Sequence, residues 1–207
     1  MVTYAQLTSD IQAWTENDDT EFTAAIDRII SLAELRVLRE VDLTIAHKQD
    51  STLSLSSGGS TITAPTDMVV PRWLRVQNGA YLLKKDESFI KEYAPSSSTT
   101  GSPKFYSYQG DGTTLLIGPF ADVAYTLEIG YTYRITGLSS STTTNWLSTN
   151  APDALFYACL IESSGFTMVE DNVVQRWISM YERARETLKR EEETRRRTDE
   201  YRAKEKR

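Results

Sequence analysis

The sequence predicts an α+β protein: both ends of the chain form a helical bundle, an antiparallel β domain is inserted between them, and a long helix protrudes at the C-terminus. Three observations predict this fold. Apolar residues recur at spacings of three and four near both ends, they alternate with polar residues in the middle, and a charged helical pattern continues beyond the last apolar stripe. Residues 1–46 and 148–207 are assigned to the bundle, and residues 47–147 to the β domain.

Two helices are predicted before residue 46. Thr3 can cap the first helix, and its apolar stripe consists of Tyr4, Leu7, Ile11 and Trp14. Asp18, with Glu21 three residues later, resembles a capping box that opens the second helix. These helices are too short and one-sided to be stable alone, so we expect the C-terminal helices to supply their partner surface.

The middle of the chain has the two-residue period of strands. Leu53, Leu55 and Ile62 alternate with Ser and Thr around Gly58-Gly59, which predicts a hairpin. Two prolines interrupt the segment that follows, so 69–76 is expected to be an edge or bulged strand.

Further strands are expected up to residue 133. We expect a short strand at 80–84, a helical turn after Asp86, and a hairpin around 110–112. The clearest alternation is at 125–133, where one side should be buried and the other exposed to water, as in antiparallel sheets.

Two helices are predicted after residue 150. Pro152 suits a first helical turn, and 154–161 is apolar all round, which indicates a buried helix. Asp171 is a plausible N-cap for the last helix. Its apolar stripe ends at Leu188, and we expect Trp177, Tyr181 and Leu188 to anchor it to the bundle.

The last helix is predicted to continue beyond Leu188 without an apolar face. Glu-to-basic pairs at i, i+4 each stabilise a helix by roughly 0.2–0.5 kcal/mol, whereas ordering one residue costs about 1–2 kcal/mol. The expected pairs are Glu186/Arg190, Glu191/Arg195, Glu192/Arg196, Glu193/Arg197 and Glu200/Lys204. We therefore hypothesise that another chain holds this helix; the alternative is a solvated charged helix.

Charge is divided unevenly along the chain. The net charge is −6, but residues 183–207 carry eleven Lys/Arg and seven Asp/Glu, which leaves −10 on the preceding 182 residues. An acidic body argues against broad nucleic-acid binding. No apolar run approaches the roughly 20 residues that span a bilayer, and Met1–Tyr4 lacks signal-peptide features, so we expect synthesis in the cytoplasm and no membrane partner.

The residues of catalysis and metal binding are scarce. His47 is the only histidine, with no second His or Cys nearby, and a surface position is favoured over metal ligation. Cys159 lies in an apolar run, where a buried, inert thiol is the favoured interpretation. No acid, base and nucleophile come together, so neither an enzyme nor a bound cofactor is expected.

The order of motifs resembles the head-to-tail adaptor proteins of tailed bacteriophages, the tail tubular protein A group and similar portal-bound adaptors. The motifs that carry the resemblance span essentially the whole chain: Tyr4-x-x-Leu7-x-x-x-Ile11-x-x-Trp14, Ile29-Ile30-x-Leu32-Ala33-Glu34, Gly101-x-Pro103-x-Phe105-Tyr106, Leu115-x-Ile117-x-Pro119-Phe120, Leu127-x-Ile129-x-Tyr131-x-Tyr133, Thr144-Asn145-Trp146-Leu147, Ala151-Pro152-Asp153-Ala154-Leu155-Phe156-Tyr157-Ala158 and Trp177-x-x-x-Tyr181-x-x-Ala184-x-x-x-Leu188.

The resemblance implies a structural protein of the virion with no catalytic role. It implies a dodecameric homo-oligomeric ring beneath the portal protein, linked to a downstream tail protein, with genomic DNA passing through the lumen without sequence-specific binding. The C-terminal helix would meet the portal through Lys189, Arg190, Arg195, Arg196, Arg197, Tyr201 and Arg202. The alternative is a nucleic-acid-binding protein that uses the same basic-rich helix, with affinity that falls steeply with salt.

Overall fold

The computed structural model describes residues 1–110, 112–167 and 169–197. The chain is an α+β protein that folds into two compact units. The helical unit comprises Met1–Thr44 and Ile135–Arg207, and the β unit comprises Ile45–Arg134. Residues 135–147, which the sequence patterns placed with the β domain, are grouped with the helices.

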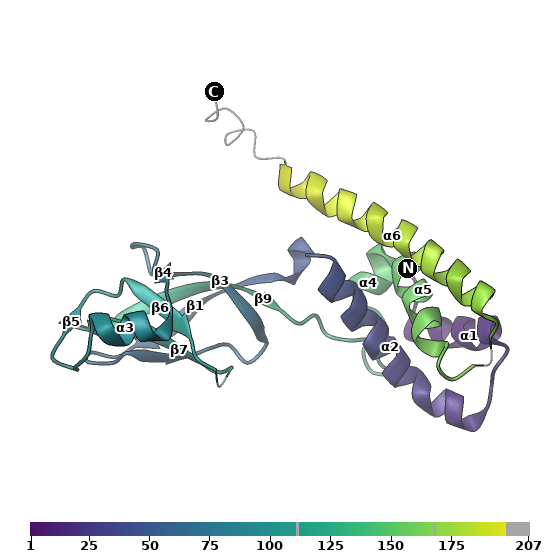
Figure 1. Cartoon of the computed structure of the whole chain (residues 1–207), viewed down its shortest axis with the longest axis horizontal. Helices are drawn as coiled ribbons and strands as arrows, with labels where there is room; N and C mark the ends of the chain where they lie inside the picture. Colours follow the sequence, from purple (N-terminus) through teal and green to yellow (C-terminus); the bar gives the residue numbers. More distant parts are fainter. Residues whose placement is uncertain (111, 168, 198–207) are drawn as a thin grey trace. The chain divides into compact units, whose positions relative to one another are not determined.

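The helical unit is organised around one central helix. Its elements are α1 (Tyr4–Thr15), α2 (Thr20–Glu40), α4 (Trp146–Asn150), α5 (Pro152–Ser163) and α6 (Asp171–Arg197). Helix α5 packs against the other four and lies between α2 and α6 (Figure 1). It buries Leu155, Ala158 and Leu160, but Phe156 and Tyr157 stay half-buried, so its burial is less complete than its composition predicts.

The start of α1 follows the sequence prediction, and the start of α2 does not. Thr3 caps α1 in a capping box with Gln6. The N-cap of α2 is Asp19, without a side-chain bond, so the capping box expected at Asp18 is wrong. The physical reason is local: the side chain of Asn17 accepts the N–H of Asp19 (3.0 Å), so the turn is completed one residue later.

A buried carboxylate on α2 bonds to the segment between β9 (Tyr125–Tyr133) and α4. Glu34 is 5% exposed, and its oxygens accept the N–H of Leu138 (3.0 Å) and the side-chain amide of Asn145 (2.6 Å). Asn145 also caps α4 in a capping box with Ser148. Burial raises the pKa of the Glu34 carboxyl, and these hydrogen bonds oppose that rise.

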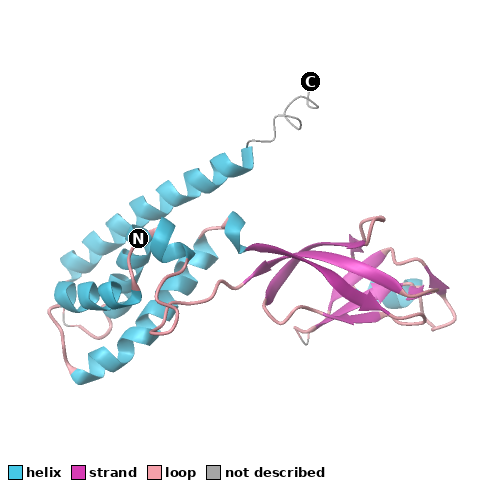
Figure 2. Ribbon diagram, turned by 180° about the vertical axis from the view of Figure 1, so that it is seen from behind, coloured by secondary structure: helices cyan, strands magenta, loops and turns pink. Residues whose placement is uncertain are grey.

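The β unit consists of sheets around one apolar core (Figure 2). Strands β1, β9 and β3 form an antiparallel sheet, β2, β7, β6 and β4 a second sheet in which β4 runs parallel to β6, and β5 and β8 a parallel pair. Helix α3 packs on β6 and β7. In chain order the elements are η1 (Thr44–Ala46), β1 (His47–Leu55), β2 (Thr61–Thr63), β3 (Met68–Val76), β4 (Leu83–Lys84), α3 (Glu87–Tyr93), β5 (Thr100–Gly101), β6 (Phe105–Tyr108), β7 (Thr114–Gly118), β8 (Phe120–Ala121) and β9 (Tyr125–Tyr133).

The hairpin expected around Gly58-Gly59 does not form. Gly58 has a left-handed φ of 72°, as a turn requires, but the strands on either side join different sheets: β1 pairs with β9, and β2 with β7. A turn signal determines where the chain bends, whereas the partner of each strand depends on distant residues. The prediction for 69–76 is confirmed, because β3 is an edge strand with irregular register near Pro71.

The middle of the second face of β9 is covered, contrary to the expected exposure to water, although Thr126 stays exposed. β9 is the central strand of its sheet, and Glu128 and Gly130 are buried. From β3, Arg75 pairs with Glu128 (2.5 Å), and the indole of Trp73 lies directly over Gly130. These side chains on the neighbouring strand cover a face that alternation alone assigned to solvent.

Gly130→Ala is expected to destabilise the β unit by about 1–3 kcal/mol, because the added methyl group would overpack the contact between β9 and Trp73. A Cβ at this position would lie 2.2 Å from the indole nitrogen of Trp73, and Trp73 would have to move. Urea unfolding followed by tryptophan fluorescence measures the change. Gly110→Ala is the control, since a Cβ there meets nothing within 4 Å; equal stability of the two variants would contradict the prediction.

Candidate interaction surface on the C-terminal helix

Helix α6 is seated on the bundle by aromatic and aliphatic side chains. Trp177, Tyr181 and Leu188 are buried, at the positions expected to anchor it. The helix begins at Asp171 itself, and the carbonyl of the preceding Glu170 accepts the N–H groups of Val173 and Val174. Asp171 is therefore the first helical residue rather than the N-cap.

Glu40, at the end of α2, receives two donors from α6. The Tyr181 hydroxyl donates to it at 3.0 Å and the Arg185 guanidinium at 2.9 Å. Burial raises the pKa of Tyr181, and the Glu40 carboxylate raises it further. A second ion pair inside the unit joins Arg36 of α2 to Glu162 of α5 (2.5 Å). We call the contacts that Trp177, Tyr181, Arg185 and Leu188 make with the rest of the helical unit the seat of α6. The seat combines buried apolar side chains with an ion pair.

The buried side of α6 continues beyond Leu188, through a charged residue. Glu192 is only 2% exposed, and its carboxylate accepts the backbone N–H of Thr44 (2.8 Å) and pairs with Arg195 (2.7 Å). Arg196 pairs with Asp42 (2.8 Å). The apolar stripe does end at Leu188, but the contacts between the helix and the bundle do not.

These contacts change the expected pairing along the helix. Glu192 pairs with Arg195 three residues on, because Glu192 faces the bundle and Arg196 turns to Asp42. Glu186 contacts Lys189 (3.7 Å) and the neighbouring Arg185 (3.5 Å). The pair Glu200/Lys204 lies outside the described residues.

The residues expected to meet the portal are placed as follows. Lys189 is half-buried beside Glu186, and Arg190 is exposed. The side chains of Arg195 and Arg196 are 50% and 43% exposed, and both contact acidic residues of their own unit. Arg195 also lies over the Trp146 ring, 5.9 Å from its centroid. Arg197 ends the helix, and its side chain is outside the description, as are Tyr201 and Arg202.

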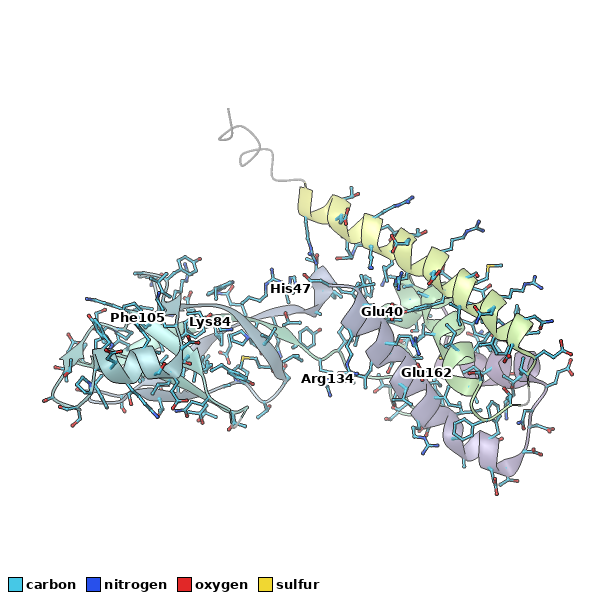
Figure 3. The ribbon with its side chains drawn as sticks, in the orientation of Figure 1. Glu40, His47, Lys84, Phe105, Arg134 and Glu162 are labelled. Atoms are coloured by element: carbon cyan, nitrogen blue, oxygen red, sulfur yellow. The ribbon has the colours of Figure 1, made fainter. Side chains whose placement is uncertain are left out.

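A stripe of three arginines, of which the sequence analysis singled out only Arg190, faces outward from α6. We call Arg176, Arg183 and Arg190 the arginine stripe; they are exposed and recur every seven residues. Over the described part of the chain none of the three forms an ion pair, although acidic residues are frequent in the same helix. Figure 3 shows nitrogen-tipped side chains projecting from the outer side of α6. The seven-residue spacing was the signal that could have revealed them.

An apolar hollow of about 280 Å³ lies where the arginine stripe begins. Trp14, which is 55% exposed, stands beside it and packs edge-on against Phe156 at 5.3 Å. The residues that line the hollow come from α1, α5 and α6: Trp14, Tyr157, Val173, Arg176, Trp177 and Met180. An exposed tryptophan beside a hollow of this kind is typical of an anchor point for a protein partner.

The described residues offer little for catalysis or metal binding. His47, at the start of β1, contacts Arg72, and within the described ranges no group of three or more His, Cys, Asp or Glu could hold a metal ion. Cys159 is fully buried, and burial raises its pKa, so the thiol stays protonated. None of the helices in the described part of the chain has both the length and the apolar character that a membrane crossing needs.

The chain was compared with known protein families and with curated proteins. A family model described as SU10 adaptor protein matches residues 2–204, nearly the whole chain. No curated protein matches the sequence.

Proposed function

Because the chain belongs to the SU10 adaptor protein family, we propose that it is a structural component of a phage virion that joins the head to the tail. In this proposal copies of the chain form a ring, a dodecamer, beneath the portal protein. The ring binds a downstream tail protein and surrounds the path of the genomic DNA. The observation that carries the proposal is the family match over residues 2–204.

The seat of α6 supports a docking role for its C-terminal end. Glu192 and Arg196 hold the last described turns to Thr44 and Asp42, so the helix presents its exposed basic side chains from a fixed base. We propose that the portal is contacted by Lys189, Arg190, Arg195, Arg196, Arg197, Tyr201 and Arg202.

The charge of the body supports a DNA path without sequence-specific binding. Residues 1–182 carry a net charge of −10. Acidic walls repel phosphates, so DNA can pass without the stable contacts that Lys and Arg make with its backbone.

Removing residues 198–207 and reversing Arg190, which is exposed and forms no ion pair with any described residue, to Glu is expected to weaken binding to the portal strongly while the protein stays folded. This variant keeps Glu192 and Arg196, so the seat of α6 on the bundle is retained. Native mass spectrometry of adaptor mixed with the portal of the same phage measures the complex.

The control variant carries Lys84→Glu and Lys104→Glu, two exposed charge reversals in the β unit. It should bind the portal as the unchanged chain does. Normal binding by the C-terminal variant would reject the assignment of this surface to the portal.

A second candidate function, nucleic-acid binding along α6, is favoured by the arginine stripe, whose members form no ion pair with any of the described residues. It predicts that duplex DNA retains the chain. The logarithm of the binding constant should then fall linearly with the logarithm of the salt concentration. The acidic body opposes it, and we expect no retention at about 0.15 M salt.

A further inference from the structure

We propose that Arg176 and Arg183 of the arginine stripe, together with the apolar hollow of the same copy, bind the acidic α1–α2 turn and the exposed ring of Phe166 on the next copy. This inference rests on the proposed ring and assigns the surfaces that would build it. One copy contributes a basic surface with a hollow, and its neighbour contributes an acidic surface with a projecting aromatic side chain.

The arginine stripe begins at the hollow and follows α6. Arg176 belongs both to the lining of the hollow and to the stripe, and Met180 lies in the same lining. Seven residues of helix rise about 10.5 Å, so the stripe runs about 21 Å from Arg176 to Arg190. An isolated arginine on an exposed face contributes little electrostatic free energy in water. It contributes more when a complementary charged surface binds and excludes that water.

The acidic surface is at the start of the chain. Residues 1–27 contain six Asp or Glu and no Lys or Arg. Four of the acids are exposed and close together at the α1–α2 turn, and they form no ion pair with any other described residue: Glu16, Asp18, Asp19 and Glu21.

An aromatic side chain stands within this acidic surface. Phe166 is 44% exposed, and together with Asp19 and Glu21 it lines a shallow depression. Phe22 packs edge-on beneath it at 6.4 Å, and Arg28 lies over its ring, so its position is fixed. The four exposed acids of the turn outnumber Arg28 at this surface. A held aromatic ring beside Asp19 and Glu21 therefore complements, in both shape and charge, an apolar hollow with Arg176 in its lining.

The positions of the two surfaces suit a ring. Both are at the end of the bundle where α1 and α5 end and α2 and α6 begin. The hollow belongs to α1, α5 and α6, whereas the acidic surface belongs to the α1–α2 turn and the loop before α6. Copies related by rotation meet at the same height, and two different complementary surfaces make a head-to-tail contact, which closes into a ring when the rotation permits.

The test is a charge swap across this contact. One variant carries Arg176→Glu and Arg183→Glu, neither of which belongs to the proposed portal set; a second carries Asp18→Arg and Asp19→Arg; a third combines all four substitutions. Native mass and sedimentation are measured over a range of concentrations, for each chain alone and with portal. Far-ultraviolet circular dichroism checks folding.

Each single-sided variant is expected to raise the concentration needed for half assembly by at least about tenfold, because like charges then face each other. The third variant is expected to restore assembly, because opposite charges face each other again in the reversed sense. Phe166→Ala should also weaken assembly, but the size of this effect should not depend on which surface carries the positive charges. Salt should weaken the assembly of the unchanged chain.

Several results would overturn the contact. Unchanged ring mass in the single-sided variants would refute it and leave the ring itself intact. If ring mass is unchanged while portal binding or DNA retention is lost in the Arg176 and Arg183 variant, the stripe belongs to the portal or to nucleic acid instead. An unchanged chain that stays monomeric, alone and with portal, would reject both the contact and the ring in the proposed function.

Discussion

Trp177→Ala is expected to lower the free energy of unfolding of the helical unit by about 3–5 kcal/mol, the range for truncating a large aromatic side chain in a core. Trp177 is 3% exposed and lies on the face of α6 that packs against α5. The residue also lines the apolar hollow, so its loss enlarges an existing space that the backbone cannot readily close. A loss of this size is a large part of the 5–15 kcal/mol that stabilises an ordinary domain.

Urea unfolding followed by the helical signal at 222 nm measures this change, because the long helices belong to the helical unit. Trp14→Ala provides a matched control. It removes the same side chain from the same hollow, but Trp14 is 55% exposed, and we expect a loss of less than about 1.5 kcal/mol. If the two variants were equally stable, Trp177 could not be the main anchor of α6.

Glu34→Ala is expected to destabilise the helical unit by about 1–3 kcal/mol at every pH, because it removes the acceptor for two donors. The N–H of Leu138 and the amide of Asn145 both bond to this carboxylate, and the contact with Leu138 is buried. Glu34 also touches the site where a Cβ on Gly137 would lie, so its removal leaves space next to the segment between β9 and α4. The segment before α4 should therefore exchange its amide hydrogens faster.

The sign of the pH dependence follows from burial. The pKa of Glu34 is raised in the folded state, so the folded chain binds more protons than the unfolded chain between the two pKa values. The proton-linked part of the stabilisation from this group is therefore fully present below the ordinary glutamate pKa, and that part is lost as the pH rises through the raised folded value, while the hydrogen bonds to Leu138 and Asn145 remain. Glu34→Gln removes the titration while keeping one acceptor oxygen.

Unfolding free energies of the unchanged chain, Glu34→Gln and Glu34→Ala, measured between about pH 4 and pH 8, test this account. The difference between the unchanged chain and Glu34→Gln should shift in favour of the glutamine variant as the pH rises. A difference that stays constant with pH would show that Glu34 titrates normally, and full stability of Glu34→Ala would reject the network.

Burial along α6 could be predicted from the sequence for the apolar residues, whereas several charged residues have contacts that the sequence did not predict. Trp177, Tyr181 and Leu188 were found because a buried stripe repeats with the helical period. Glu192 was missed, because a glutamate is normally a surface residue and only the approach of Thr44 gives it a buried partner. Arg196 was assigned to Glu192 by spacing, yet Asp42, more than 150 positions away, is its partner.

The sequence alone determined the fold class, the burial of most of α5, the cap at Thr3 and the edge position of β3. These features depend on composition or on residues within one or two turns of each other, where periodicity and capping act. The tertiary structure alone decided that β1 and β2 join different sheets, that Trp73 covers Gly130, and that Glu192 extends the seat of α6. Each of these depends on which distant segments come together to bury apolar surface and satisfy polar groups, and no local pattern contains that information.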